Sequence, residues 1–266
     1  MLQSLYTSVS GIRSHQQMLD VLANNLANVN TPGYKSSRAL FADSLSSELS
    51  GLQIGMGISL SEVATDFRQS GQQFTGLPTD LALQGTGFFV LQDAASGGLY
   101  YTRDGSFSLD SSSFLVAADG LRVQGSATGV DGSAFGDLVV ASTDPLNPME
   151  TFTIGTDGKI EILRSDGTTE IAGYVGLEEF VNEGGLFKAG QNMFTAPPDA
   201  SPVWGAFQTP GSSGLGQIRS GYLEMSNVDM SEEFTAMIRS QRGLQASARI
   251  ISTADEILQE ITNLKR

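Results

Sequence analysis

The sequence predicts an α+β protein in which long N- and C-terminal helices pair as a coiled coil, with an inserted all-β domain that is a sandwich or an irregular barrel. Two observations carry this prediction. Both ends of the chain have apolar side chains at heptad spacing and no proline over about thirty residues. The middle of the chain has short runs of β-favouring residues between Asp-Gly turns. The predicted parts are an N-terminal coiled-coil helix with its Asn-rich Pro-Gly turn (1–35), an extended linker (36–76), a β-rich domain (77–221) and a C-terminal coiled-coil helix (222–266).

The first predicted helix, over residues 2–28, carries a heptad seam. Its apolar row is Leu2, Leu5, Val9, Ile12, Leu19 and Leu26. The segment has no proline and a single glycine, so a helix of about 40 Å is allowed at 1.5 Å per residue. Taken alone, the seam also fits one helix of a globular bundle. A second seam at the other end of the chain favours the coiled coil.

A Pro-Gly turn ends this helix abruptly. The turn consists of Thr31, Pro32, Gly33 and Tyr34. Pro32 disfavours helical backbone at Thr31, and Gly33 permits a positive φ, so the chain leaves the helix direction here. The asparagines just before the turn are Asn24, Asn25 and Asn28. They are weak helix formers, and their amides can cap backbone groups or hydrogen-bond to another helix.

Alternation and turn signals describe the middle of the chain. Over residues 52–60, apolar residues alternate with small or polar ones, as in a half-buried strand. Asp-Gly dipeptides, which favour the positive φ of tight hairpin turns, recur in the β-rich domain. They stand at 104–105, 119–120, 131–132, 157–158 and 166–167.

The segment from Ser231 to Arg266 is predicted to form the second long helix, with Asp229 as a capping residue at its start. One apolar row comprises Phe234, Met237, Leu244, Ala248, Ile251 and Leu258. An adjacent row comprises Ile250, Ala254, Ile257, Ile261 and Leu264. Two adjacent rows make a wide apolar face, which can contact more than one partner helix.

The composition narrows the function. A net charge of -14 and a pI near 4.3 argue against nucleic acid and against an anionic membrane surface as partners. The absence of cysteine excludes disulfides and thiol chemistry. We expect no direct membrane insertion and no cleaved signal peptide, because the sequence has neither an apolar run of the necessary length nor the basic and apolar regions of a secretory signal.

The sequence predicts no catalytic, cofactor-binding or metal-binding residues, and therefore no enzyme. His15 is the only histidine, which excludes a His-based triad in the β-rich domain and a two-His metal site. The Asp-Gly pairs lack the spacing of a calcium-binding loop. The many Asp and Glu residues leave a glycosidase-type carboxylate pair open.

Several motifs, in order along the chain, resemble those of bacterial flagellar axial proteins. They are Ser10-Gly11, the run from Asn24 to Lys35, Asp80-Leu81-Ala82 with Gly87-Phe88-Phe89, the run from Tyr101 to Phe107, the run from Gly221 to Asp229, and Gln241-Arg242. The resemblance spans essentially the whole chain. It implies a helical homopolymer in the form of a tube, with the paired terminal helices as an inner domain and the β domain facing outward.

The resemblance also implies the partners and the location. The neighbours would be rod, hook, junction and cap proteins of the flagellum, and export would use the flagellar type III apparatus without a cleaved signal. One apolar face would contact the chain's own partner helix and the other would contact neighbouring subunits. The predicted contact residues are Leu2, Leu5, Val9, Ile12, Leu19, Leu26, Asn24, Asn25, Asn28, Phe234, Met237, Leu244, Ile251, Leu258 and Ile261.

Within the family, the C-terminal motifs look most like those of a short hook subunit. The chain has no room for the further outer domain that many hook subunits carry, and residues 51–55 and 152–155 resemble rod subunits. We predict a hook subunit, which transmits motor torque and encloses the export channel. The distal rod, a stiff drive shaft, is the alternative, and packing of the linker is expected to decide between them. An extracellular β-rich adhesin or a carbohydrate-active enzyme is an alternative of another class.

Overall fold

The computed structural model describes residues 2–44, 46–49, 52–126, 135–141, 149–197, 202, 207–212 and 214–264. The chain divides into two compact units. The helical unit consists of Met1–Val29, Ser36–Asp66 and Val228–Arg266, and the β unit consists of Asn30–Lys35 and Phe67–Asn227. The chain therefore passes between the units four times, and both of its ends belong to the helical unit.

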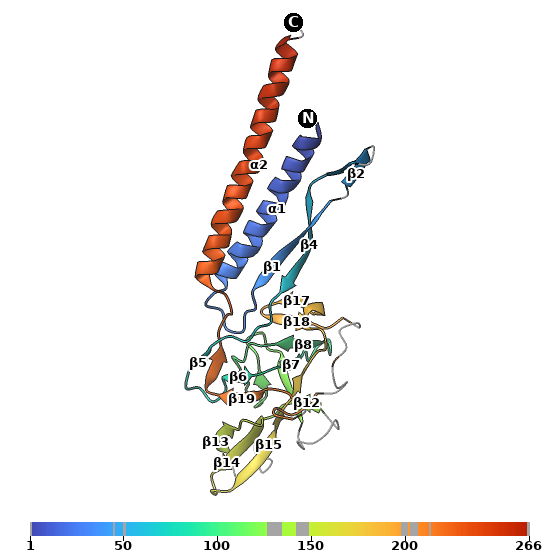
Figure 1. Cartoon of the computed structure of the whole chain (residues 1–266). Helices are drawn as coiled ribbons and strands as arrows, with labels where there is room; N and C mark the ends of the chain where they lie inside the picture. Colours follow the sequence, from blue (N-terminus) through green and yellow to red (C-terminus); the bar gives the residue numbers. More distant parts are fainter. Residues whose placement is uncertain are drawn as a thin grey trace. The chain divides into compact units, whose positions relative to one another are not determined.

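Two long helices lie side by side in the helical unit (Figure 1). They are α1 (Leu2–Ala27) and α2 (Met230–Leu264). Asp229 caps α2, because its Oδ1 accepts a hydrogen bond from the Ser231 N–H at 2.8 Å. The α+β class with a helix at each end is therefore confirmed, and the helix bounds agree with the prediction to within one or two residues.

A two-stranded hairpin packs against α1 in the same unit. β1 (Ser37–Asp43) pairs antiparallel with β4 (Ile58–Thr65), and β2 (Ser46–Leu49) pairs with β3 (Leu52–Gly55) in the intervening segment. Half-buried and exposed side chains alternate along most of β1, as expected for a strand with one covered face. We call β1 and β4 the hairpin.

The β unit is built on one branched sheet of twelve strands, and every pairing between its described strands is antiparallel. Its main path runs β13-β14-β15-β11-β7-β8-β18-β17. The sandwich or irregular barrel that we predicted is not confirmed. The strands of this sheet are β7 (Phe88–Gln92), β8 (Leu99–Thr102), β9 (Ser108–Leu109), β10 (Leu115–Val116), β11 (Arg122–Ser126), β12 (Phe135–Asp137), β13 (Met149–Ile154), β14 (Lys159–Arg164), β15 (Thr169–Val175), β16 (Leu177–Glu178), β17 (Phe187–Gly190) and β18 (Met193–Thr195).

Two shorter strand pairs and a single helical turn complete the unit. β6 (Leu81–Gln84) pairs with β19 (Gln217–Ser220), and β5 (Gln72–Phe74) pairs with β20 (Tyr222–Glu224). The short 3-10 helix η1 spans Glu183–Gly185.

Three of the predicted Asp-Gly turns are confirmed. Gly120, Gly158 and Gly167 have φ of 80°, 72° and 80° and join neighbouring antiparallel strands. The pair at 104–105 was predicted for the wrong reason. Gly105 has no positive φ, and glycine is required there because a Cβ would lie 1.6 Å from the Leu81 carbonyl oxygen. The pair at 131–132 lies outside the described residues.

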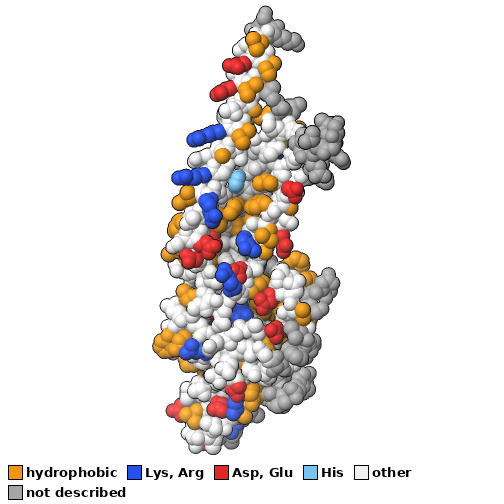
Figure 2. All heavy atoms as spheres, viewed as in Figure 1, with side chains coloured by type: hydrophobic (Ala, Val, Ile, Leu, Met, Phe, Trp, Pro, Cys, Tyr) orange, Lys and Arg blue, Asp and Glu red, His pale blue; other side chains and the backbone are white. Residues whose placement is uncertain are grey.

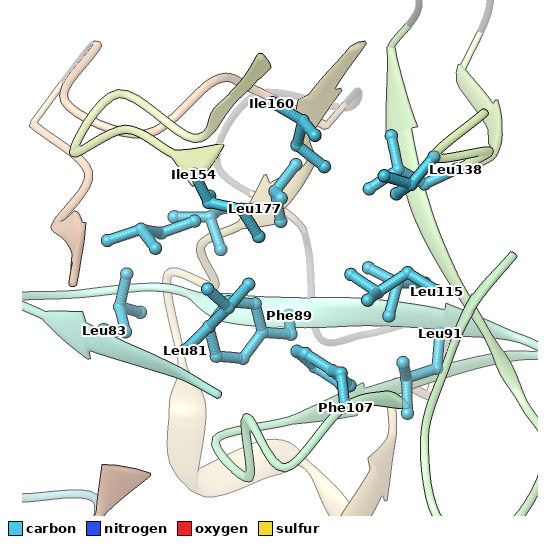
Figure 3. Close-up of a cluster of buried hydrophobic side chains, with 14 of the residues drawn as sticks. Leu81, Leu83, Phe89, Leu91, Phe107, Leu115, Leu138, Ile154, Ile160 and Leu177 are labelled. Carbon is cyan, nitrogen blue, oxygen red and sulfur yellow. The ribbon is translucent and has the colours of Figure 1, made fainter. Parts of the chain in front are cut away.

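The main core of the β unit lies where these strands cross. Figure 3 shows Phe89 and Phe107 facing Leu81, with Leu91 and Leu115 beside them. The rings of Phe89 and Phe107 meet edge to face, with centroids 5.3 Å apart.

In the part of the chain that the structure describes, neither helix has the length and apolar character needed to cross a membrane.

Candidate functional site

α1 and α2 pack antiparallel through small residues. A Cβ placed on Gly243 would lie 2.4 Å from Cε1 of His15, and one on Gly11 would lie 3.1 Å from the Ser247 hydroxyl oxygen. The Ser240 hydroxyl donates a hydrogen bond to the His15 carbonyl oxygen at 3.0 Å. The two backbones therefore approach closely, because these positions have almost no side chain to hold them apart.

Asn25 joins three elements of the helical unit. Its Nδ2 donates to the Ser37 carbonyl oxygen of β1 at 2.8 Å and to Oε1 of Glu233 in α2 at 3.0 Å, and its Oδ1 accepts from the Ser37 N–H at 2.9 Å. Burial raises the pKa of Glu233 above its ordinary value, and the Asn25 hydrogen bond opposes this shift. Asn28 instead donates to the carbonyl oxygen of Asn24 at 2.9 Å within the same turn. The asparagines thus show both of the uses that we predicted for them.

The predicted seam of α1 does not lie on the line of contact with α2. The buried residues of α1 are Ser8, Gly11, Ser14, Leu22 and Asn25. The seam follows a different strip, roughly a third of a turn away at 100° per residue. Val9 is 39% exposed, and the seam residues Leu5, Ile12, Leu19 and Leu26 are half-buried. The side chain of Leu2 lies outside the described residues. The contact line was missed because small residues give no apolar signal.

The predicted row of α2 divides between two surroundings. Met237, Leu244 and Ile251 are half-buried on the side that faces α1, whereas Phe234 is 48% exposed. The antiparallel register set by Gly11 and Ser247 places Leu2 opposite Glu256, so the last turns of α2 extend beyond the start of α1 (Figure 1). The exposed apolar side chains of these turns are Ile257, Leu258, Ile261 and Leu264. We call them the α2 overhang.

The Pro-Gly turn is seated inside the β unit. Gly33 has φ of 68°, and a Cβ there would lie 2.5 Å from the Asp104 backbone nitrogen. The Gly33 N–H donates to the Glu224 carbonyl oxygen at 2.8 Å, and the Asn192 amide donates to the Pro32 carbonyl oxygen at 3.0 Å. Tyr34 is buried. The turn is thus held by segments that are distant in the sequence.

A buried ion cluster lies beside the turn. Lys35 Nζ lies 2.6 Å from Glu224 Oε1 and 2.8 Å from the Arg68 carbonyl oxygen. Arg103 lies 3.6 Å from Glu224 Oε2, and the Ser70 N–H donates to Glu224 Oε1 at 3.0 Å. Burial lowers the pKa of Lys35, an effect that the Glu224 carboxylate opposes.

Sequence reasoning missed this cluster, although each charged residue stands in a motif that we quoted. Lys35, Arg103 and Glu224 come from three separate motifs, and each is a charged residue within a largely uncharged run. A charged residue within an uncharged motif was the available signal. One sequence alone could not show that these three residues lie together in the fold.

The described residues offer no metal centre. They contain no group of three or more His, Asp or Glu side chains placed to hold a metal ion. The chemistry that the arrangement does support is association, since apolar side chains remain exposed along both long helices.

Family models match three parts of the chain. One described as "Flagella basal body rod protein" matches residues 5–35, and one described as "Flagellar hook protein FlgE/F/G D1 domain" matches residues 82–162. A third, "Flagellar basal body rod FlgEFG protein C-terminal", matches residues 219–264. The matched segments follow the order in which the family's motifs occur along this chain.

Curated relatives match over the full length. The flagellar basal-body rod protein FlgG of Bacillus subtilis (strain 168) is 40% identical over 279 residues, with 100% of both chains covered. FlgG of Borreliella burgdorferi is 33% identical over 282 residues, again with 100% of both covered. The flagellar hook protein FlgE of the same organism is 26% identical over 445 residues, with 100% of both chains covered.

Proposed function

The chain belongs to the family of flagellar rod and hook proteins, and from this premise we propose that it is a subunit of the basal-body rod that polymerises through its terminal helices. As a member of this family it is a structural flagellar axial subunit. The relatives named above are flagellar structural proteins, so they give the adhesin or carbohydrate-active enzyme alternative no support.

The rod alternative is better supported than the hook subunit that we predicted. The alignment with the B. subtilis rod protein extends over 279 residues, close to the 266 of this chain. The alignment with the Borreliella hook protein extends over 445, so at least 179 aligned positions (445 minus 266) have no counterpart here. The missing outer domain therefore outweighs the hook-like motifs at the C-terminus.

The observation that carries the polymerisation proposal is the incomplete burial of the α1 seam, where Val9 is exposed and the other described side chains are half-buried, together with the exposure of the α2 overhang. The contact between α1 and α2 uses small residues and leaves Val9, Ile257 and Ile261 39–48% exposed. Full burial of such a side chain contributes about 1.5–3 kcal/mol, so these strips favour association. They lie on different surfaces of one subunit, and contacts between unlike surfaces produce an open helical polymer when the rotation does not close.

The resemblance supplies the remaining parts of the proposal. The helical segments, predicted at 1–35 and 222–266, form the inner wall of a tube through which other subunits are exported. The subunit reaches its place through the type III apparatus and contacts the adjoining rod, hook, junction and cap proteins. The composition, and not the resemblance, supports two further parts of the proposal: a net charge of -14 argues against binding of nucleic acid, and the sequence has no apolar run of the length needed for membrane insertion.

Electron microscopy of purified protein at rising concentration tests the proposal. The wild type is expected to form tubes, and straight tubes favour the rod whereas curved tubes favour the hook. Leu19→Asp should prevent tube formation, because it introduces a charge into the apolar seam. A variant lacking residues 257–266, and therefore the overhang, should also fail to form tubes.

The matched control is Gln17→Asp, which adds the same charge to α1 at an exposed position outside the seam. Far-ultraviolet circular dichroism should show an intact β unit in every variant. Tubes from Leu19→Asp at the same concentration as from Gln17→Asp would remove the seam from the interface. A wild type that stays monomeric even on preformed flagellar templates would contradict self-assembly.

A further inference from the structure

Three hairpin turns of the β unit share one sequence pattern and one backbone geometry. Their tips are Asp119-Gly120, Asp157-Gly158 and Asp166-Gly167. In each turn the glycine N–H donates to the carbonyl oxygen three residues earlier, at 2.9, 3.0 and 2.9 Å respectively. The N–H of that earlier residue donates to the carbonyl oxygen of the residue after the glycine, at 2.9, 2.8 and 3.0 Å. The backbones of the three turns are therefore closely matched.

The three aspartate side chains are held to different degrees. Asp166 Oδ1 accepts hydrogen bonds from the Thr168 N–H at 2.9 Å and from the Thr168 hydroxyl at 2.6 Å. Asp157 Oδ1 accepts one longer bond, from the Lys159 N–H at 3.3 Å. No hydrogen bond or ion pair joins the Asp119 carboxylate to any other residue that the structure describes. The equivalent of Thr168 in that turn is Leu121, which has no hydroxyl.

This difference matters because an Asp-Gly pair can react with itself. Glycine has no Cβ, so its backbone nitrogen is less shielded than that of any other residue. The nitrogen can attack the aspartate carboxyl carbon only when the carboxyl group is protonated and turned toward it. The two Thr168 hydrogen bonds oppose both conditions at Asp166, since they hold the carboxylate in place and lower its pKa.

We propose that Asp119 is a site of spontaneous covalent modification, at which the Asp119-Gly120 linkage isomerises to isoaspartate. The Gly120 nitrogen forms a bond to Asp119 Cγ, and the carboxyl hydroxyl leaves with the amide proton as water, which closes a five-membered succinimide. Water then adds to the α-carbonyl carbon of Asp119, whose bond to the nitrogen breaks. The chain now continues through Cγ, and the α-carboxyl group is free. One water is released and one is taken up, so no other reactant is needed.

Access of water does not distinguish the three turns. Figure 2 shows acidic side chains at the surface of the β unit, and Asp119, Asp157 and Asp166 are all exposed. The restraint on each carboxylate is therefore what separates them. The remaining described pair, Asp104-Gly105, is protected in another way, because Asp104 Oδ1 accepts two hydrogen bonds from Ser106 and Gly105 is buried.

The modification would alter the turn between β10 and β11. It lengthens the backbone by one carbon atom, beside the register pair Val116 and Arg122. It also moves the negative charge from the side chain to the α-carboxyl group without changing the net charge. A subunit that is not replaced would accumulate this change with age. The inference does not depend on self-assembly, because a single chain contains the whole reacting group.

Incubation of the purified chain in oxygen-18 water at neutral pH tests the proposal. Each passage through a succinimide places one oxygen-18 atom in the product, and peptide fragmentation in a mass spectrometer assigns it to one aspartate. We expect labelling to be fastest at Asp119, slower at Asp157 and slowest at Asp166. Asp119 should react about tenfold faster than Asp166, where two hydrogen bonds must first break. In urea the three rates should converge, because the turns are then lost.

Reciprocal variants identify the cause. Leu121→Thr supplies a hydroxyl at the position equivalent to Thr168 and should slow labelling at Asp119 about fivefold. Thr168→Ala, at an exposed position, removes the hydroxyl and should speed labelling at Asp166 about fivefold. In each variant the unaltered turns serve as internal controls.

Two results would overturn the inference. One is equal labelling of the three aspartates in the folded chain, and the other is an unchanged rate at Asp166 in Thr168→Ala. Neither result would affect the proposed function, because the experiment needs no polymer. A wild type that forms no tubes would likewise leave this inference standing.

Discussion

The ion cluster around Glu224 shows how one buried residue can serve three segments. The Glu224 carboxylate forms ion pairs with Lys35 and Arg103. The Glu224 carbonyl oxygen accepts a hydrogen bond from the Gly33 N–H. Lys35 and Arg68 stand within two residues of positions where the chain passes between the units. The cluster therefore fixes the β-unit ends of those connections.

The effect of substituting a residue of this ion cluster depends on which buried charges then lack a partner. Lys35→Met leaves Glu224 with Arg103 as a remaining counter-ion, whereas Glu224→Gln leaves two buried cations with only the more distant carboxylate of Glu183. Breaking a buried pair costs about 3–5 kcal/mol, so we expect both changes to destabilise the β unit and Glu224→Gln to do so more. Chemical denaturation followed by circular dichroism measures the difference. The reverse order would show that the Lys35 pair dominates the cluster.

Glu178 should make the stability of the β unit depend on pH. Burial raises the pKa of Glu178 to about 7, and its hydrogen bond with Tyr101 opposes the shift. The folded state then binds more protons than the unfolded state between about pH 4.5 and 7, so stability falls as pH rises through this window. We expect a loss of roughly 2 kcal/mol across it.

Glu178→Gln is the control for this prediction. The amide cannot ionise, so urea denaturation midpoints measured from pH 5 to pH 8 should lose most of this slope. Glu183, whose pKa is also raised by burial, contributes a smaller slope that remains in the variant. An unchanged slope in Glu178→Gln would assign the pH dependence to other groups.

At the scale of single elements, the helix pair depends on the absence of a side chain at Gly243. Alanine there would raise helix propensity by about 1 kcal/mol. Its Cβ would however meet the His15 ring at 2.4 Å. We therefore expect Gly243→Ala alone to lower the thermal stability of the helical signal, and His15→Ala combined with Gly243→Ala to restore or exceed it. If the two effects simply add, the helices do not meet at this point.

Helix bounds could be predicted from the sequence because their signals are local. Pro32 stops α1, and Asp229 caps α2 through its own side chain. The face of α1 that contacts α2 could not be predicted. Apolar periodicity identifies the most apolar strip of the helix, whereas the buried strip contains the small residues Ser8, Gly11 and Ser14. The Asp-Gly dipeptides likewise predicted three hairpin turns, because that signal is also local. They did not predict the pairing of strands that are distant in the sequence, such as β7 and β11.

At the scale of the whole molecule, charge is unevenly distributed. The β unit, residues 30–35 and 67–227, contains 8 Lys and Arg against 18 Asp and Glu, a net charge of -10. The helical unit carries the other -4 of the total -14. Neighbouring copies in a polymer therefore repel one another mainly through their β units.

This repulsion predicts that salt promotes assembly. Raising NaCl from about 50 to about 300 mM shortens the range of charge interactions, so the ten net negative charges of each β unit repel those of neighbouring copies less. The critical concentration for polymerisation should therefore fall as the salt concentration rises. Asp119→Lys with Glu150→Lys, which removes four units of negative charge, should show a smaller salt dependence. A critical concentration that rises with salt would mean that attraction between opposite charges governs the contact.

The placement of α1 and α2 at opposite ends of the chain has a consequence for timing. Nearly all of the β unit is one continuous stretch, Phe67–Asn227, and its strands find their partners within that stretch. The helix pair is completed only when both ends of the chain are present, whichever end is delivered first. A subunit that emerges gradually from a narrow passage therefore forms its helix pair, which carries the exposed apolar side chains, after its β unit. If the subunit is exported as we propose, this order of folding delays association with neighbouring copies until the whole chain has left the passage.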